Sequence, residues 1–404
     1  MRSTAPEPTP PKAWRMLALG VAAQAAGTLL VSIPAYLIAL LHTEHGMPLA
    51  GAGLLASAPL IGMMLTLVVW GALADRFGER WVIAGGLALT SLFALAAAPV
   101  HGYVLLGALL VCGGAAAAST NAASGRVVVG WFPRHRRGLA MGIRQMSQPL
   151  GVALAALTVP TLAARYGTWA PLLLAAGATL VVAVACAAGI VNPPRPAASA
   201  AQPSAGGSVR PANPYAGNRF LVRIHVVSLL LVFPQFALST FGLVWLNVGL
   251  NWPAHAAGAV MAAAQFVGAL GRIGVGVLSD RVGSRVRVLR WVAVSAVAVM
   301  LALAATDVLG WQAAAAIVLI AATAISVADN GLAFTCVAEA AGPAWAGKAL
   351  GIQNTGQFLA AAAVGPAIGA IITAAGYPAA FALVALTPLL ALGLIPRQDR
   401  HWAD

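Results

Sequence analysis

Apolar stretches long enough to cross a lipid bilayer recur along the whole chain. A run of about 20 apolar residues spans a membrane as a helix, and turn signals divide this sequence into twelve such segments. Only 8% of the residues are charged, whereas soluble domains contain roughly 25%. The sequence lacks the alternating segments of roughly ten residues that mark a membrane β-barrel. It therefore predicts an all-α integral membrane protein with twelve transmembrane helices.

The twelve expected helices fall into two sets of six. The expected spans are 14–41, 49–74, 81–100, 103–132, 138–164, 169–191, 219–248, 255–279, 288–306, 311–340, 346–375 and 377–395. The segment between the two sets is rich in Pro, Ala, Ser and Gly and has no apolar period, which is typical of a flexible linker. The expected organisation is a disordered tail at 1–13, a six-helix half at 14–191, a linker at 192–218, a second half at 219–395 and a tail at 396–404.

The distribution of Lys and Arg predicts the orientation of the chain, because these residues are enriched in cytoplasmic loops. They gather in both tails, in the linker and in every second connection, beginning with the one between the second and third helices. The other side holds only Arg165. Both termini and the linker are therefore expected in the cytoplasm, in a multi-pass protein of the inner (plasma) membrane. The net charge of +13 arises from these anchoring residues, so we expect no nucleic-acid partner.

Two motifs occur once in each set of six helices. GALADRFGER at 71–80 returns as GVLSDRVGSR at 276–285, which is 205 residues later. RGLAMGIRQMSQ at 137–148 is similar to GKALGIQNTGQ at 347–357, with an offset of 209 residues. Six-helix repeats joined by a cytoplasmic linker imply a pseudo-two-fold axis along the membrane normal and a binding site between the halves.

Twelve helices, a central linker and a G-x-L-x-D-R-x-G-x-R turn after the second and eighth helices resemble the major facilitator superfamily. The resemblance covers nearly the whole chain. It implies the fold of that family, with two pseudo-symmetric six-helix halves, and secondary active transport by alternating access. It also implies that the protein works as a monomer.

The resemblance further implies that the two charged turns act in gating. Asp75 is expected at the cytoplasmic end of the second helix, where it would cap the positive N-terminus of the eleventh helix. Asp280 would do the same for the fifth helix at Gly138, and both contacts would hold the halves together in the outward-open state. The alternative is that the turns are only positive-inside anchors. The expected gating residues are Gly71, Asp75, Arg76, Gly78, Arg80, Gly276, Asp280, Arg281, Gly283 and Arg285.

The glycines of the turns have steric roles in this interpretation. Gly78 and Gly283 would let the chain turn tightly, and Gly71 and Gly276 would allow close helix contact.

Five charged residues lie inside the apolar segments, where a charge costs at least about 2.5–3.5 kcal/mol and marks a pathway or an ion pair. They fall on the fourth, fifth, eighth and tenth helices, which by resemblance face the central cavity or the interface between halves. The third, sixth, ninth and twelfth helices carry none in their interiors and would face lipid. The five residues are Arg126, Arg144, Arg272, Asp329 and Glu339.

Arg272 is the leading candidate for substrate binding. An arginine at this place in GRIGVGVLSDR resembles monocarboxylate and oxalate/formate-type porters, in which it binds the substrate carboxylate. A guanidinium stays charged and its fork fits a carboxylate. The alternative is an interhelical hydrogen bond to backbone carbonyls. Gly268 and Gln357 replace an acid and a lysine of those porters, which disfavours oxalate itself.

The related stretches on the fifth and eleventh helices supply further candidates. Arg144 and Gln148 are four residues apart and therefore share a helix face, and their repeat mates are Gln353 and Gln357. Asn354 is adjacent. These residues are expected to bind substrate between the halves, and the alternative is polar packing between helices.

Asp329 is expected near the membrane midplane and is the candidate for proton coupling, because a desolvated carboxylate can load and release protons. The alternative is a structural pair with Arg126 or Arg272. Arg126 and Glu339 are expected to be structural or gating residues, with Glu339 paired to Lys348 or to a loop arginine.

Together these features predict a secondary active transporter of a small organic anion, a carboxylate, driven by protons or by exchange. One alternative is proton-driven efflux of drugs or other amphiphiles, and a second is a transporter-like sensor. The sequence contains no Ser/His/Asp arrangement, metal cluster or phosphate loop. We therefore expect no enzyme, cofactor or metal site, and the expected partners are the substrate, protons and lipid.

Overall fold

Long helices make up nearly all of the structure, a computed structural model that describes residues 11–132, 140, 143–192, 213–216, 219–342 and 345–400. A helix bonds its backbone groups within one segment, as a lipid environment requires. The first half comprises α1 (Pro11–Thr43), α2 (Leu49–Phe77), α3 (Glu79–Ala97), α4 (Tyr103–Trp131), α6 (Ser147–Tyr166) and α7 (Trp169–Gly189). The second comprises α8 (Phe220–Val244) with the π-helix η2 (Trp245–Gly249), α9 (Ala254–Val282), α10 (Arg285–Val308), α11 (Gln312–Ser326), α12 (Asp329–Ala341) and α13 (Ala346–Leu394).

The described helices account for twelve membrane passes. Eleven segments are long and apolar enough to cross a membrane, and the last of them, α13, contains two passes. The chain turns within α13 at Gly376, whose φ of 80° is not helical. In contrast, α11 and α12 together form one pass that is interrupted between them. The prediction of twelve helices in an all-α membrane fold is confirmed.

Residues at the edges of the expected tails and linker are part of a helix or hydrogen-bond to one. α1 begins at Pro11, three residues before its expected start, because proline suits the first turn of a helix. The Asn192 side chain accepts a hydrogen bond from the backbone N–H of Arg80 (2.9 Å). Asp399 accepts one from the backbone N–H of Val286 (2.9 Å). Each of these side chains thus caps a helix start in its own half.

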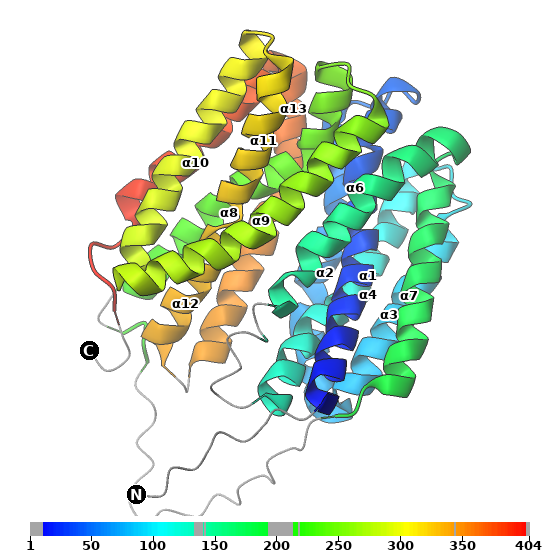
Figure 1. The fold of residues 1–404 in the computed structure, drawn as a ribbon. Helices are drawn as coiled ribbons and strands as arrows, with labels where there is room; N and C mark the ends of the chain where they lie inside the picture. Colours follow the sequence, from blue (N-terminus) through cyan, green and yellow to red (C-terminus); the bar gives the residue numbers. More distant parts are fainter. Residues whose placement is uncertain are drawn as a thin grey trace, which may run out of the picture.

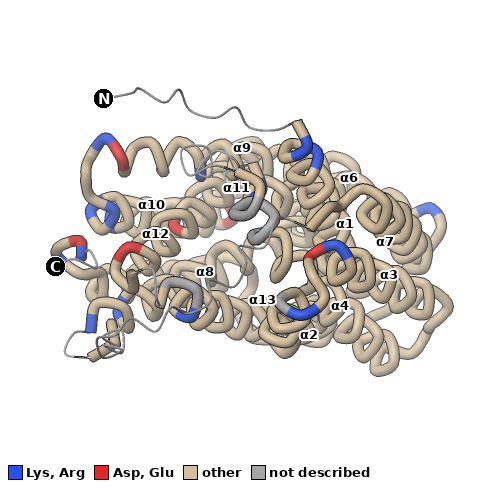
Figure 2. Tube along the Cα trace, turned by 90° about the horizontal axis from the view of Figure 1, so that it is seen from below, with Lys and Arg blue, Asp and Glu red and all other residues tan. Residues whose placement is uncertain are grey.

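The two halves stand side by side, with α1–α7 on one side and α8–α13 on the other (Figure 1). α2 packs along α13, and α6 packs along α9, so the same pairing of helices occurs twice across the interface. The two ends of the described chain lie at the same end of the bundle, which we call the termini end. A view onto that end shows Lys and Arg mainly where helices end or connect (Figure 2).

At the end opposite the termini, the backbones of the two halves touch at glycines. A Cβ on Gly365 of α13 would lie 2.1 Å from the carbonyl oxygen of Gly53 in α2. A Cβ on Gly258 of α9 would lie 2.3 Å from the carbonyl oxygen of Ala156 in α6. A Cβ on Gly276, which was expected to allow close helix contact, would have no described atom within 4 Å. The steric role expected for Gly71 stays a prediction.

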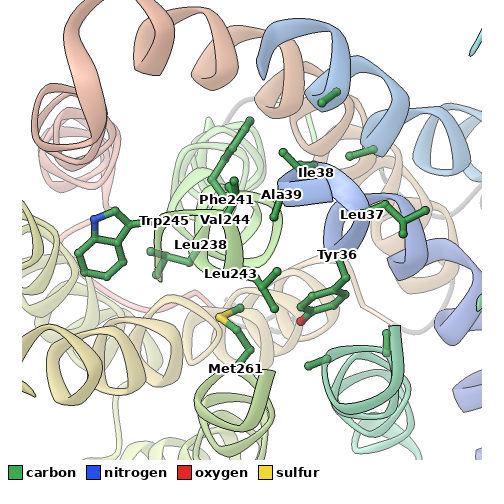
Figure 3. Packing of buried hydrophobic residues seen from close by; sticks show 14 of the residues in the cluster. Tyr36, Leu37, Ile38, Ala39, Leu238, Phe241, Leu243, Val244, Trp245 and Met261 are labelled. Carbon is green, nitrogen blue, oxygen red and sulfur yellow. The ribbon is translucent and has the colours of Figure 1, made fainter. Parts of the chain in front are cut away.

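An apolar cluster seals the interface near that end. Ile38 and Ala39 of α1 lie near Phe241 and Val244 of α8, and the Tyr36 ring extends toward Leu243 of α8 and Met261 of α9 (Figure 3). All of these side chains are buried. The cluster bounds the cavity described below, because Tyr36 belongs to both.

Candidate functional site

A central cavity lies between the two halves. The empty space within it, part of which is open to the outside, amounts to about 730 Å³. Its walls come from α1, α2 and α6 of the first half and from α8, α9 and α11 of the second. Described residues of α3, α7 and α10 do not line it, and neither do those of α4 or α13. No described side chain of the fourth helix, which was expected at the cavity or the interface, lines the cavity, and the side chains of 125–130 lie outside the described residues.

Uncharged polar groups dominate the polar part of the cavity wall. Three glutamines and six hydroxyl side chains accompany a single charged residue, the cation Arg272. The polar lining residues are Thr28, Ser32, Tyr36, Gln148, Gln235, Ser239, Thr240, Gln265, Arg272 and Thr323. Of the predicted substrate-binding residues, only Arg272 and Gln148 are among them.

Arg272 and Asp329 interact electrostatically, from α9 and α12. Asp329 is the first residue of α12, directly after the break that separates α12 from α11. The free N–H groups and positive dipole of a helix N-terminus favour a carboxylate at this position. Asp329 is only 1% exposed, yet no described side chain hydrogen-bonds its carboxylate oxygens or the Nε of Arg272. The two charges are thus close without being closed into a hydrogen-bonded pair.

Arg144 belongs to a polar network inside the first half. Its Nε donates to Ser124 Oγ (2.9 Å), and its Nη2 donates to the backbone oxygen of Asn121 (3.3 Å). The Gln24 amide donates to the Asn121 side chain (2.7 Å). This network joins α1, α4 and the start of the fifth pass. The bonds of Arg144 support its packing alternative, whereas its neighbour Gln148 reaches the cavity.

A related network occurs in the second half. Asn330 donates to Gln235 (2.8 Å), and Gln357 donates to both Asn330 (3.0 Å) and Ser228 (2.7 Å). Asn121 and Asn330 are 209 residues apart, the same offset that relates the two repeated stretches. Asn330 and Gln235 were not predicted from the sequence, although this offset was the signal that could have identified Asn330.

Gln353 contacts a different group. Its side-chain oxygen lies 3.1 Å from His225 Nδ1, and the other ring nitrogen of His225 lies 3.0 Å from the Tyr215 hydroxyl. Partial burial raises the pKa of the Tyr215 phenol above its usual value. Asn354 is half-buried and does not line the cavity.

The glycines of the charged turns adopt the expected tight conformations. Gly78 has a φ of 83° and Gly283 a φ of 68°, values that suit glycine because it has no Cβ. Arg80 donates from Nε to the Ala187 oxygen at the end of α7 (2.7 Å). This turn therefore ties the third pass to the sixth.

In the second turn, Asp280 is exposed and forms an ion pair with Arg285 of the same turn. Arg285 also lies 3.7 Å from Glu339 at the end of α12. The side chains of Asp75 and Arg126 and the whole of Gly138 lie outside the described residues. The latch contacts of the two turns therefore stay predictions.

Two lining hydroxyls were missed from the sequence. Tyr36 and Thr323 are 2% and 3% exposed, and neither hydroxyl has a hydrogen-bond partner among the described residues. Thr28, Ser32 and Tyr36 are spaced by four residues and so share one face of α1. That spacing was a signal, but α1 is apolar on its other faces as well.

Comparisons with known proteins agree with this architecture. The family model described as the Major Facilitator Superfamily matches residues 16–363. An uncharacterized MFS-type transporter of Mycobacterium tuberculosis is 46% identical over 95% of this chain and 84% of its own length. A probable chloroplastic anion transporter of Oryza sativa is 31% identical over 39% of this chain and 30% of its own. A solved bacterial homologue of the human lysosomal transporter Spinster, inward-facing and occupied, has a TM-score of 0.74 at 15% identity, covering 96% of this chain and 95% of that one.

Proposed function

Since the chain belongs to the major facilitator superfamily and is therefore a secondary transporter, we propose that its cargo is a small organic anion carrying a carboxylate. The observation that carries this proposal is Arg272, the only charged residue among the described residues of the cavity wall. A guanidinium offers a permanent charge and a fork of donors that matches a carboxylate. The partial similarity to a plant protein named as a probable anion transporter points the same way.

Asp329 supplies the coupling in this proposal. When Asp329 is ionised, it offsets the charge of Arg272, and the unliganded cavity is balanced. When Asp329 is protonated, the positive charge of Arg272 is no longer offset. The negative charge of the cargo carboxylate then offsets it instead. Proton and anion therefore bind together. The open geometry between Arg272 and Asp329 favours this role over a purely structural ion pair.

The charged turns would serve as the latch between two conformations. In this structure the halves touch at the end opposite the termini, and Asp280 is exposed. Both observations fit a latch that is released while the cavity faces the termini end. We further propose that this end faces the cytoplasm and that the protein works as a monomer in the cell membrane.

Uptake into proteoliposomes tests the proposed cargo. The purified protein is offered a panel of labelled carboxylates, with and without a pH gradient. Accepted anions should accumulate faster when the gradient drives protons in the same direction. Arg272→Ala should abolish uptake of all of them, because it removes the only cation on the described wall.

Arg165→Ala is the matched control, since Arg165 is exposed at the opposite end of the bundle. It should transport at the wild-type rate. Unchanged uptake of every accepted anion by Arg272→Ala would show that this arginine does not bind the carboxylate.

A further inference from the structure

The cavity wall offers more hydrogen-bonding side chains than a carboxylate on a plain hydrocarbon chain could bond. Nine uncharged polar side chains surround one cation. Hydroxyl and amide side chains each donate and accept hydrogen bonds, so they match groups that also do both. Hydroxyl groups on a ligand have this property, whereas methylene groups do not.

Two of these side chains have no hydrogen-bond partner among the described residues. The hydroxyls of Tyr36 and Thr323 are buried and make no hydrogen bond to a described residue. Buried polar groups in proteins are nearly always hydrogen-bonded, so such exceptions call for an explanation. The hydroxyls of Thr28 and Ser239, by contrast, donate to backbone oxygens of their own helices. A cargo that bonds Tyr36 and Thr323 would complete the polar surface of the cavity.

The polar groups are spread along the cavity. The Tyr36 ring extends from α1 toward Met261 of α9 (Figure 3). Arg272 follows Met261 by eleven residues on the same helix, which is about 16 Å along the axis. Long helical side chains lean toward the helix N-terminus, so the guanidinium approaches Tyr36, and Gln265 lies between them along α9. The site is therefore elongated, with a charged end in the second half and a hydroxyl end on the first.

We propose that the cargo is a polyhydroxylated monocarboxylate, the chemical class of the sugar acids. Its carboxylate binds Arg272, and its hydroxyls bind Tyr36, Thr323 and the cavity glutamines. The assignment rests on the proposed function, because it takes Arg272 as the carboxylate site. It adds that both halves recognise the cargo. An unsubstituted acid of the same length would leave the buried hydroxyls unpaired, and sites built to bond a hydroxyl reject such analogues strongly.

Calorimetry on the full chain in lipid nanodiscs tests this assignment with gluconate and hexanoate. The two ligands have the same number of carbons and one carboxylate each, and empty nanodiscs correct for partitioning into lipid. Gluconate should bind the wild-type protein at least about tenfold more tightly than hexanoate. Tyr36→Phe should weaken gluconate binding by about threefold to tenfold and leave hexanoate binding unchanged.

Tyr377→Phe is the matched control. Tyr377 also has a buried hydroxyl without a partner among the described residues, but it does not line the cavity. Its substitution should leave the affinity for both ligands unchanged. Arg272→Gln should abolish binding of both ligands.

The outcomes separate this inference from the proposed function. Equal wild-type affinity for gluconate and hexanoate would overturn the sugar-acid assignment and leave the carboxylate proposal standing. An equal loss of both ligands in Tyr36→Phe would also overturn it, because Tyr36 would then act on the fold rather than on hydroxyls. Failure of the wild-type protein to bind or transport any carboxylate would overturn both.

Discussion

Asp329 is buried beside Arg272, and no described side chain bonds its oxygens. Its protonation therefore decides how much of the arginine's charge is left for a cargo. An uncompensated charge in the membrane interior costs at least about 2.5–3.5 kcal/mol. In the proposed mechanism, the empty carrier changes conformation with Asp329 ionised, and the loaded carrier does so with Asp329 neutral. The proposal therefore couples anion movement to proton movement at this pair of residues.

Asp329→Asn should separate exchange from net transport. The variant keeps Arg272 and a side chain of similar size, so a loaded carrier still has a balanced cavity. Its empty form carries an uncompensated cation and should return slowly. Labelled anion should therefore still exchange with unlabelled anion across the proteoliposome membrane. Net uptake driven by a pH gradient should fall by about tenfold or more.

The matched substitution is Asp307→Asn, since Asp307 lies near the opposite end of α10, where it accepts a hydrogen bond from Trp245. It should leave the dependence on the pH gradient intact. Net uptake by Asp329→Asn at the wild-type rate, with unchanged pH dependence, would remove Asp329 from the coupling.

The residues of the site differ in how visible they are in the sequence. Arg272 and Asp329 are conspicuous because a charge inside an apolar segment is costly. Tyr36 is less conspicuous, because the hydroxyl side chains that share its face of α1 are a weaker signal than a charge in a long apolar helix. Arg144 stands out in the sequence as clearly as Arg272 does, but it donates hydrogen bonds to Asn121 and Ser124 within the first half. A charged residue in a membrane span thus predicts that a polar contact exists, but only the structure shows which group the residue contacts.

At the element scale, the backbones of α2 and α13 come into close contact at a pair of glycines. Gly53 and Gly365 leave no room for a Cβ, which would lie about 2 Å from the facing carbonyl oxygen. Glycines at such crossings let helices approach closely. A larger residue there should push the halves apart at the end opposite the termini and so disfavour this conformation.

Gly365→Ala tests that contact with spin labels. His101→Cys and Gly310→Cys place one label on each half at the opposite end, in a background in which the native cysteines are replaced by serine. The distance between the labels should shift to longer values in Gly365→Ala. Gly393→Ala, at the other end of α13 with no described atom near its Cβ position, should leave the distance unchanged. No shift in Gly365→Ala would mean that the contact does not hold this conformation.

The elements themselves were predictable where their signals are local. Apolar length gave the twelve passes, and the glycines at Gly78 and Gly283 gave the turns that follow α2 and α9. The interruption between α11 and α12 was not predicted, because no proline marks it. This interruption places Asp329 at a helix start, so the structure was needed to see why a buried carboxylate is tolerated there.

At the scale of the whole molecule, the two halves share a helix network, but the charged pair at the cavity belongs to the second half alone. Each half joins its first and fourth helices through a glutamine–asparagine pair, Gln24 with Asn121 and Gln235 with Asn330. Arg272 and Asp329 occur only in the second half, and the first half supplies Gln148 and the hydroxyls of α1 to the cavity. In the proposed mechanism, the repeated helix packing therefore supplies the two moving halves, and the residues that depart from the repeat supply the binding site.

This asymmetry predicts that wild-type transport is electroneutral for a monovalent anion. The empty carrier holds one positive and one negative charge in the pair, and the loaded carrier holds Arg272, a protonated Asp329 and one anion, so its net charge is the same. Moving one charge through 100 mV changes the free energy by about 2.3 kcal/mol. A potential imposed with potassium and valinomycin should nevertheless leave wild-type uptake unchanged.

The slow net uptake of Asp329→Asn should become voltage-dependent, because its empty form carries an extra positive charge while its loaded form does not. Strong voltage dependence of wild-type uptake would mean that a charge other than these three crosses with the cargo.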